Sequence, residues 1–189
     1  MDHSPHGGRR ATAGGIRSHG MRRLGVVLLT LAAALVAAPA GAAHADTGWH
    51  EINSLWANKC IDMIRESGTG NGVLAQLWDC TQTPEQQFAV IDAGGGFFLL
   101  QNQRSGRCLR PSEDQLTTNT LIEQFDCSFA DFGQQWQSVD PGGNSQGARW
   151  LINRLSNKCI EDSAWATVNG VKLTQSDCLG AWKDFWYVV

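Results

Sequence analysis

The sequence predicts an all-β domain made of three similar repeats of about 45 residues each. Two observations carry this prediction: six cysteines recur at regular spacing, and the residues that flank them recur as well. Between these anchors lie short apolar alternations, such as residues 73–78 and 97–101, separated by Gly, Asn, Ser and Pro. Their lengths are those of short strands, and no run keeps a helical period.

Residues 1–45 are predicted to be an N-terminal extension followed by a secretory signal peptide. Two arginines precede an uncharged run over residues 24–38, and a small-x-small pattern at 43–45 matches a signal-peptidase site. We therefore expect secretion, with cleavage after Ala45 and with Met21 as the true start. An uncleaved membrane anchor is the alternative, but the second half of the uncharged run is rich in Ala, Pro and Gly.

Cleavage would leave an acidic domain. Residues 46–189 carry 10 Lys and Arg against 17 Asp and Glu, a net charge of −7, which argues against nucleic acid or an anionic membrane as a partner. A single histidine, His50, remains, which argues against a Ser-His-Asp or Cys-His enzyme and a histidine-based zinc site. We expect no metal and no cofactor, whereas catalysis by paired carboxylates stays open.

Each repeat contains the same three anchors in the same order. It begins with a Cys-aliphatic-polar segment, continues to an Asp-Cys pair and ends on an aromatic residue. The repeats span about 48–95, 96–146 and 147–189. About four strands in each give roughly twelve strands, spaced as in an all-β barrel. The terminal aromatic residues, which we expect to fill the core, are Phe88, Trp136 and Trp186.

The cysteines fall into three pairs with separations of 20, 19 and 19 residues. Six cysteines allow about 15 pairings, and the repetition favours one disulfide inside each repeat. The predicted disulfides are Cys60–Cys80, Cys108–Cys127 and Cys159–Cys178. Three zinc-binding cysteine pairs are the competing interpretation, against which the predicted export and the wide spacing argue.

These anchors resemble the ricin-B-type β-trefoil lectins, which also occur as carbohydrate-binding modules of secreted actinobacterial enzymes. The resemblance covers residues 48–189 and rests on the threefold Cys-[Ile/Leu]-x start, the Gln-Leu-Trp-Asp-Cys run at 76–80 and the Gln-x-aromatic endings. The third repeat departs from it, because Asp184-Phe185-Trp186 has lost the glutamine. The resemblance implies a β-trefoil fold and a carbohydrate as the partner.

The family pattern marks a carbohydrate-binding site in the first repeat. A pyranose needs an aromatic surface for its C–H face, a carboxylate that accepts hydroxyl protons, and amides that donate or accept. In the family the carboxylate lies two residues after the first cysteine, and the aromatic lies two before the second. The matching residues are Asp62, Gln76, Trp78, Glu85 and Gln86. Glu85 stands where the family usually has Asn, and Gln86 could be either a support or a ligand contact.

The other two repeats depart from this pattern. The second keeps an aromatic residue, Phe125, but Arg110 replaces the carboxylate, and a cation accepts no hydroxyl protons. In the third repeat Ser176 replaces the aromatic residue. We expect neither position to bind a sugar. Trp165 and Trp182 lie in variable loops of the third repeat, where core or edge packing is the expectation.

The sequence therefore predicts a secreted, non-catalytic carbohydrate-binding protein that uses its first repeat, with galactose-type or xylan-type sugars as ligands. A single shallow site gives weak binding, about −4 kcal/mol, so avidity would need an oligomer or a protein partner. The main alternative is a protein-interaction or inhibitor module with degenerate sugar sites. A third is a small hydrolase that uses Asp62 with another carboxylate.

Overall fold

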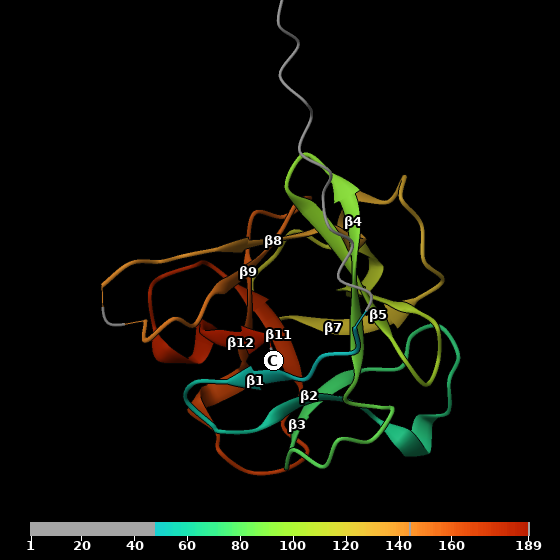
Figure 1. The fold of residues 1–189 in the computed structure, drawn as a ribbon, viewed down its shortest axis with the longest axis horizontal. Coiled ribbons are helices and arrows are strands. Elements are labelled where there is room, and N and C mark those ends of the chain that lie inside the picture. Colours follow the sequence, from blue (N-terminus) through green and yellow to red (C-terminus); the bar gives the residue numbers. More distant parts are fainter. Residues whose placement is uncertain (1–47, 144, 189) are drawn as a thin grey trace, which may run out of the picture. The chain divides into compact units, whose positions relative to one another are not determined.

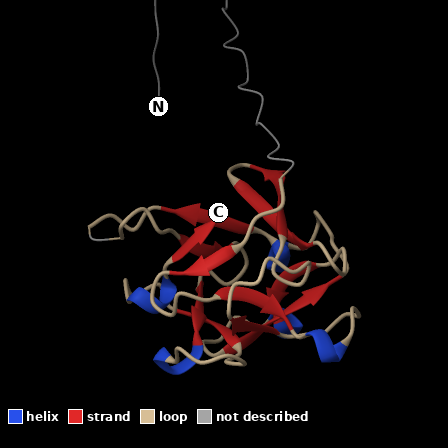
Figure 2. Cartoon of the chain, turned by 60° about the horizontal axis from the view of Figure 1, so that its bottom comes forward, coloured by secondary structure: helices blue, strands red, loops and turns tan. Residues whose placement is uncertain are grey.

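A computed structural model describes residues 48–143 and 145–188 of the chain (Figure 1). The predicted signal peptide and the cleavage site after Ala45 lie outside the described residues. Within them there are twelve strands, as predicted, and five short 3-10 helices, which Figure 2 shows as single turns between strands. None of the described helices is long and apolar enough to cross a membrane.

Each repeat contributes four strands. The first has β1 (Ile52–Ser54), β2 (Cys60–Met63), β3 (Ala75–Trp78) and β4 (Phe88–Gly94). The second has β5 (Phe97–Asn102), β6 (Cys108–Pro111), β7 (Thr120–Phe125) and β8 (Trp136–Val139). The third has β9 (Trp150–Asn153), β10 (Cys159–Asp162), β11 (Leu173–Ser176) and β12 (Trp186–Val188). The helices are η1 (Arg65–Ser67), η2 (Ser112–Asp114), η3 (Phe132–Gln134), η4 (Ser163–Trp165) and η5 (Trp182–Asp184).

The first and last strands of each repeat close a six-stranded ring. Antiparallel pairing joins β4 to β5, β5 to β8, β8 to β9 and β12 to β1. Two isolated bridges complete the ring. His50↔Phe88 joins the first and fourth strands of the first repeat, and Arg149↔Trp186 joins those of the third. A closed ring leaves no unpaired strand edge, which is the usual liability of a small sheet.

The middle strands form three hairpins, β2–β3, β6–β7 and β10–β11. The hairpins contact one another through β7–β11 pairing and through the bridges Leu74↔Glu123 and Gln76↔Lys172. Figure 1 shows β2 beside β1, with which it pairs, and β3 beside β2. A closed six-stranded ring with three associated hairpins is the β-trefoil arrangement that the family resemblance implied.

The core is built around the three terminal aromatic residues. Phe88, Trp136 and Trp186 are fully buried and belong to one hydrophobic cluster, which confirms the prediction. The indole N–H of Trp136 donates to the carbonyl of Leu109 (3.0 Å), and that of Trp186 donates to the carbonyl of Ile160 (2.9 Å). Each indole is thus anchored to the residue after the first cysteine of its own repeat, which satisfies the one polar atom that its burial removes from water.

The repeated cysteine segments have a local structural cause. The structure contains the three predicted disulfides, one in each repeat. Two residues before each first cysteine, the chain turns through a left-handed conformation at Asn58, Gly106 and Asn157 (φ +50°, +67° and +56°). Asn and Gly adopt that conformation with the least strain. These turns place the first cysteine of each repeat at the start of the equivalent strand, β2, β6 or β10.

Candidate functional site

The first-repeat hairpin carries a pocket of about 200 Å³ where the family pattern predicts a sugar. Asp62 on β2 and Gln76 on β3 face each other in register, and the side-chain amide of Gln76 donates to Oδ1 of Asp62 (2.9 Å). Four of the five predicted residues line this pocket. The full lining is Asp62, Arg65, Glu66, Gln76, Trp78, Thr81, Thr83 and Glu85.

Gln86, the fifth predicted residue, lies behind the wall. It is fully buried, and its amide donates to Oδ2 of Asp62 (3.2 Å) and to the carbonyl of Asp79 (2.8 Å). Its side-chain oxygen accepts from the backbone N–H of Thr81 (2.7 Å). Of the two roles open to Gln86, the geometry favours the support, because its polar atoms are engaged with the protein and shielded from a ligand.

The carboxylate of Asp62 is held in place by two amides, one on each oxygen. Burial raises the pKa of Asp62, the hydrogen bonds from Gln76 and Gln86 lower it, and the nearby charges of Glu85 and Glu66 raise it; the net direction is upward. A carboxylate oxygen has room for more than one hydrogen bond, so Asp62 can still accept hydroxyl protons from a ligand in the pocket.

Trp78 supplies an open aromatic surface beside Asp62. It is the one exposed residue of β3, with 40 % of its surface accessible, while Ala75, Gln76 and Leu77 are buried. An exposed indole next to a fixed carboxylate provides an apolar face and an acceptor in the same pocket. This is the combination that a pyranose requires.

Glu85 is bound within a cluster that the sequence did not reveal. Its Oε1 atom lies 3.1 Å from Nε of Arg65 and 3.2 Å from a guanidinium nitrogen of Arg104. Its Oε2 atom is shielded and has no hydrogen-bond partner within the described residues. Arg65 lies two residues after the end of β2, so its closeness to the site could have been inferred from the sequence. Arg104 belongs to the second repeat, and no sequence pattern links it to this site.

A third cation comes from the third repeat. The ammonium group of Lys172 donates to the side-chain oxygen of Gln76 (3.1 Å), across the bridge that joins the first and third hairpins. This bond and the donation to Asp62 fix the orientation of the Gln76 amide: its nitrogen faces Asp62 and its oxygen faces Lys172. The pocket is therefore held by side chains from all three repeats.

The equivalent position of the second repeat is filled by its own side chains. The Nε atom of Arg110 donates to Oε1 of Glu123 (3.0 Å), and the guanidinium stacks on the Phe125 ring, 3.7 Å from its centroid. The hydroxyl of Ser112 donates to the other oxygen of Glu123 (2.9 Å). The aromatic face and the acidic group that a sugar would use are thus both engaged by the protein.

In the third repeat the carboxylate is also engaged. Glu161 is buried, forms an ion pair with Lys183 and accepts from the hydroxyl of Thr174 (3.3 Å). Of the core or edge packing expected for Trp165 and Trp182, core packing does not occur, because about half of each side chain is exposed. Trp165 makes an edge contact with Trp56 of the first repeat, with ring centroids 5.3 Å apart.

Comparison with known proteins agrees with this geometry. Residues 39–125 match the family described as the ricin-type beta-trefoil lectin domain-like family. A search of curated protein sequences finds no significant match.

Solved structures show the same fold over the described domain. A designed threefold-symmetric protein, ThreeFoil, superposes with a TM-score of 0.70 at 23 % identity, covering 75 % of this chain and 97 % of that chain. An exo-β-1,3-galactanase from Clostridium thermocellum gives 0.70 at 24 % identity, covering 76 % of this chain and 30 % of the enzyme. The Rhizoctonia solani agglutinin gives 0.64 at 10 % identity, covering 76 % and 94 %.

At these identities the structural matches establish the fold alone, whereas the family match covers the hairpin that carries Asp62 and Trp78. The closed ring of six strands and the three disulfide-linked hairpins extend the same architecture through the remaining repeats. The chain therefore contains a β-trefoil domain, and residues 39–125 match the ricin-type β-trefoil lectin family.

Proposed function

We propose that the protein is a secreted, non-catalytic carbohydrate-binding protein whose ligand occupies the first-repeat pocket. One observation carries the proposal: Trp78 presents an exposed indole beside Asp62, whose two oxygens are each held by a buried amide. The site is thus preorganised, so a ligand does not have to order it on binding.

In this proposal a pyranose lays its C–H face on Trp78, and two neighbouring hydroxyls donate to Asp62. The exposed guanidinium of Arg65 gives a donor at the rim. Galactose-type or xylan-type sugars are the candidates. The structural likeness to part of a β-1,3-galactanase supports galactose-type ligands as the first to be tested.

A glycan array tests the proposal. The secreted protein is compared with Asp62→Ala and Trp78→Ala, and Trp49→Ala is the matched control because Trp49 is exposed to a similar extent but does not line the pocket. We expect the native protein and the control to bind the same glycans, and the two site variants to lose at least about tenfold in affinity, or about 1.4 kcal/mol.

A protein-interaction module is the second candidate. It is favoured by the ion pairs that fill the second and third sugar positions and by exposed apolar residues such as Leu179, Trp165 and Trp182. A native protein that binds no glycan on the array, although folded, would favour this candidate over the lectin proposal.

Secretion is part of the proposal. Three disulfides require an oxidising compartment to form and persist, which agrees with the predicted signal peptide. Mass spectrometry of the exported protein tests the cleavage site: the expected N-terminal residue is Asp46, and a retained segment from residue 21 onward would contradict it.

A further inference from the structure

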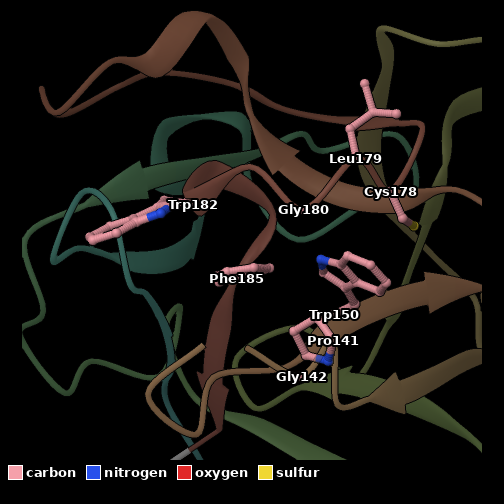
Figure 3. Close-up of a pocket in the computed structure, with 8 residues that line it drawn as sticks. All are labelled: Pro141, Gly142, Trp150, Cys178, Leu179, Gly180, Trp182 and Phe185. Atoms are coloured by element: carbon pink, nitrogen blue, oxygen red, sulfur yellow. The ribbon is translucent and has the colours of Figure 1, made fainter. Parts of the chain in front are cut away.

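A second and larger pocket lies between the third repeat and the end of the second, outside all three sugar positions. Its volume is about 310 Å³, against about 200 Å³ for the first-repeat pocket. The residues that hold the third sugar position, Glu161, Ser176 and Lys183, do not line it. Its lining is Pro141, Gly142, Trp150, Cys178, Leu179, Gly180, Trp182 and Phe185 (Figure 3).

In the first repeat a charged side chain fills the corresponding place. Nine residues before the first cysteine stands Glu51, where the third repeat has Trp150. The carboxylate of Glu51 accepts from the backbone N–H of Gln82 (2.9 Å), two residues after the second cysteine. Trp150 cannot make this bond, because an indole offers a donor and no acceptor.

A second difference lies at the position of Phe185, where the second repeat has a glutamine. Gln135 stands directly before the terminal aromatic residue, and its amide donates to the carbonyl of Phe129 (2.7 Å). Phe185 takes this position in the third repeat and has no polar atom in its side chain. Its ring lies 6.2 Å from the ring of Trp150, at an interplanar angle of 44°, so the two rings form walls of the pocket rather than a stack that closes it.

Two donors beside these rings are left without acceptors. Gly180 corresponds to Gln82, since both follow the second cysteine by two residues and both are left-handed (φ +75° and +57°). The N–H of Gly180 makes no hydrogen bond within the described residues. A Cβ on Gly180 would lie 3.9 Å from the Trp150 ring, so this backbone borders the indole.

The second donor is the indole of Trp150. Its Nε1 is shielded from solvent and has no hydrogen-bond partner in residues 48–143 and 145–188. Figure 3 shows this nitrogen on the edge of the ring that faces Phe185. A shielded donor without an acceptor lowers stability, and a ligand oxygen that reached it after a small ring rotation would recover part of that loss.

The chemistry of the pocket defines its ligand. None of the eight lining residues has a side chain that ionises at neutral pH, since Cys178 is in a disulfide. The rings offer apolar faces, and the indole N–H groups of Trp150 and Trp182 and the backbone N–H of Gly180 are donors. We propose that this pocket is a second saccharide subsite, which takes one neutral pyranose ring with its C–H face on the aromatic wall and an oxygen accepting from Gly180.

The volume agrees with this ligand, since about 300 Å³ is the lower end of the range for small-molecule pockets. The subsite does not depend on Asp62 or Trp78. A polysaccharide that engaged both pockets would be held more tightly than by either pocket alone. Two weak sites on one chain would then provide avidity without an oligomer.

Nuclear magnetic resonance of the ¹⁵N-labelled secreted protein tests the subsite. Lactose, xylotetraose and diacetylchitobiose are titrated separately to about 20 mM, a range that detects millimolar affinity. The Trp78→Ala variant is used so that binding at the first-repeat pocket is weakened by at least about tenfold. We expect at least one probe to shift the Gly180 amide and the Trp150 indole signals in a saturable way.

Substitution of the exposed wall makes the test specific. Trp182→Ala should abolish the saturable shifts at Gly180 and Trp150, and Trp49→Ala, which removes an equally exposed indole elsewhere, should leave them unchanged. The subsite is refuted if no probe shifts these signals, or if Trp182→Ala leaves them intact. In the native protein, shifts at Trp78 alone would support the first-repeat site and overturn this one, and shifts at Gly180 alone would do the reverse.

Discussion

The guanidinium of Arg110 lies 3.7 Å from the centroid of the Phe125 ring and donates through Nε to Glu123 at 3.0 Å. One side chain thus covers the aromatic face of the second repeat and neutralises its acidic neighbour. The substitution of a carboxylate by arginine at this position does more than remove an acceptor, because the new side chain occupies the place of a ligand.

Removing this arginine should destabilise the fold. Arg110→Met leaves the largely buried Glu123 with a hydrogen bond from the hydroxyl of Ser112 but without the cation that pairs its charge. We expect the free energy of unfolding in urea to fall by about 2 kcal/mol. Arg110→Met combined with Glu123→Gln should recover part of the loss, and a change below about 0.5 kcal/mol in the single variant would contradict this account.

Sugar binding should weaken as the pH falls. Burial raises the pKa of Asp62 above the ordinary 3.8, so the carboxylate becomes protonated at a higher pH than an exposed aspartate. A protonated Asp62 loses acceptor capacity toward ligand hydroxyls. Calorimetric titration should show affinity that declines on acidification, whereas Asp62→Asn should bind weakly at every pH.

Asp79→Asn provides the control for this profile. Asp79 is exposed, and hydrogen bonds from Lys59 and Asn169 lower its pKa. Its side chain does not line the pocket, so the variant should keep the native pH dependence. An unchanged affinity of the native protein between pH 7 and the acidic limit of folding would contradict the role given to Asp62.

The third repeat should make the fold more stable in mild acid. Asp184 lies two residues before the terminal aromatic residue, at the position of Gln86 and Gln134 in the other repeats. Each glutamine side chain accepts from a backbone N–H and donates to a backbone carbonyl, whereas a carboxylate cannot donate. Burial, with the charge of Glu161, raises the pKa of Asp184 to about 6 against the attraction of Lys183. Burial raises the pKa of Asp162 to about 7; Lys183 lowers it, and Glu161 and Asp184 raise it.

Both pKa values exceed the ordinary 3.8, so the folded protein holds protons that the unfolded chain releases. The stabilisation is complete below about pH 4 and is lost as the pH rises through 6 to 7. We expect the free energy of unfolding in urea to be higher at pH 5 than at pH 8 by on the order of 2 kcal/mol. Asp184→Gln should reduce this difference and stabilise the protein at pH 8; an equal difference in the variant would contradict the assignment.

Each disulfide should contribute comparably, since each closes a loop of 19 or 20 residues. The double variant Cys108→Ala/Cys127→Ala should lose on the order of 3 kcal/mol in the free energy of unfolding, in the chain-entropy description. Peptide mapping without reduction checks the pairing, and a bridge between two repeats would contradict it.

The fold could be predicted because its causes are local and repeated. Asn58 and Gly106 meet the need for a left-handed turn, and the cysteines and terminal aromatic residues recur at fixed distances from that turn. Repetition makes a weak signal strong, since three copies of a short pattern with the same phase do not arise by chance.

The site was predictable only in part, because spacing reports the residues of one hairpin. Asp62 and Trp78 could be placed from their distance to the cysteines. Arg104 and Lys172 reach the site from other repeats through tertiary contacts that leave no pattern in the sequence. The Trp150 pocket was missed for a related reason: its lining residues come from separate segments, 141–142, 150 and 178–185, that no spacing rule brings together.

The most direct test of the account compares two aromatic residues at equivalent positions. Trp78 is exposed beside a carboxylate, and Phe125 is covered by Arg110. The affinity of the native protein, Trp78→Ala and Phe125→Ala is measured by calorimetry for one glycan selected on the array. We expect a loss of at least about tenfold for Trp78→Ala and a change below about twofold for Phe125→Ala. Equal losses, or a loss confined to Phe125→Ala, would contradict the assignment of sugar binding to the first repeat.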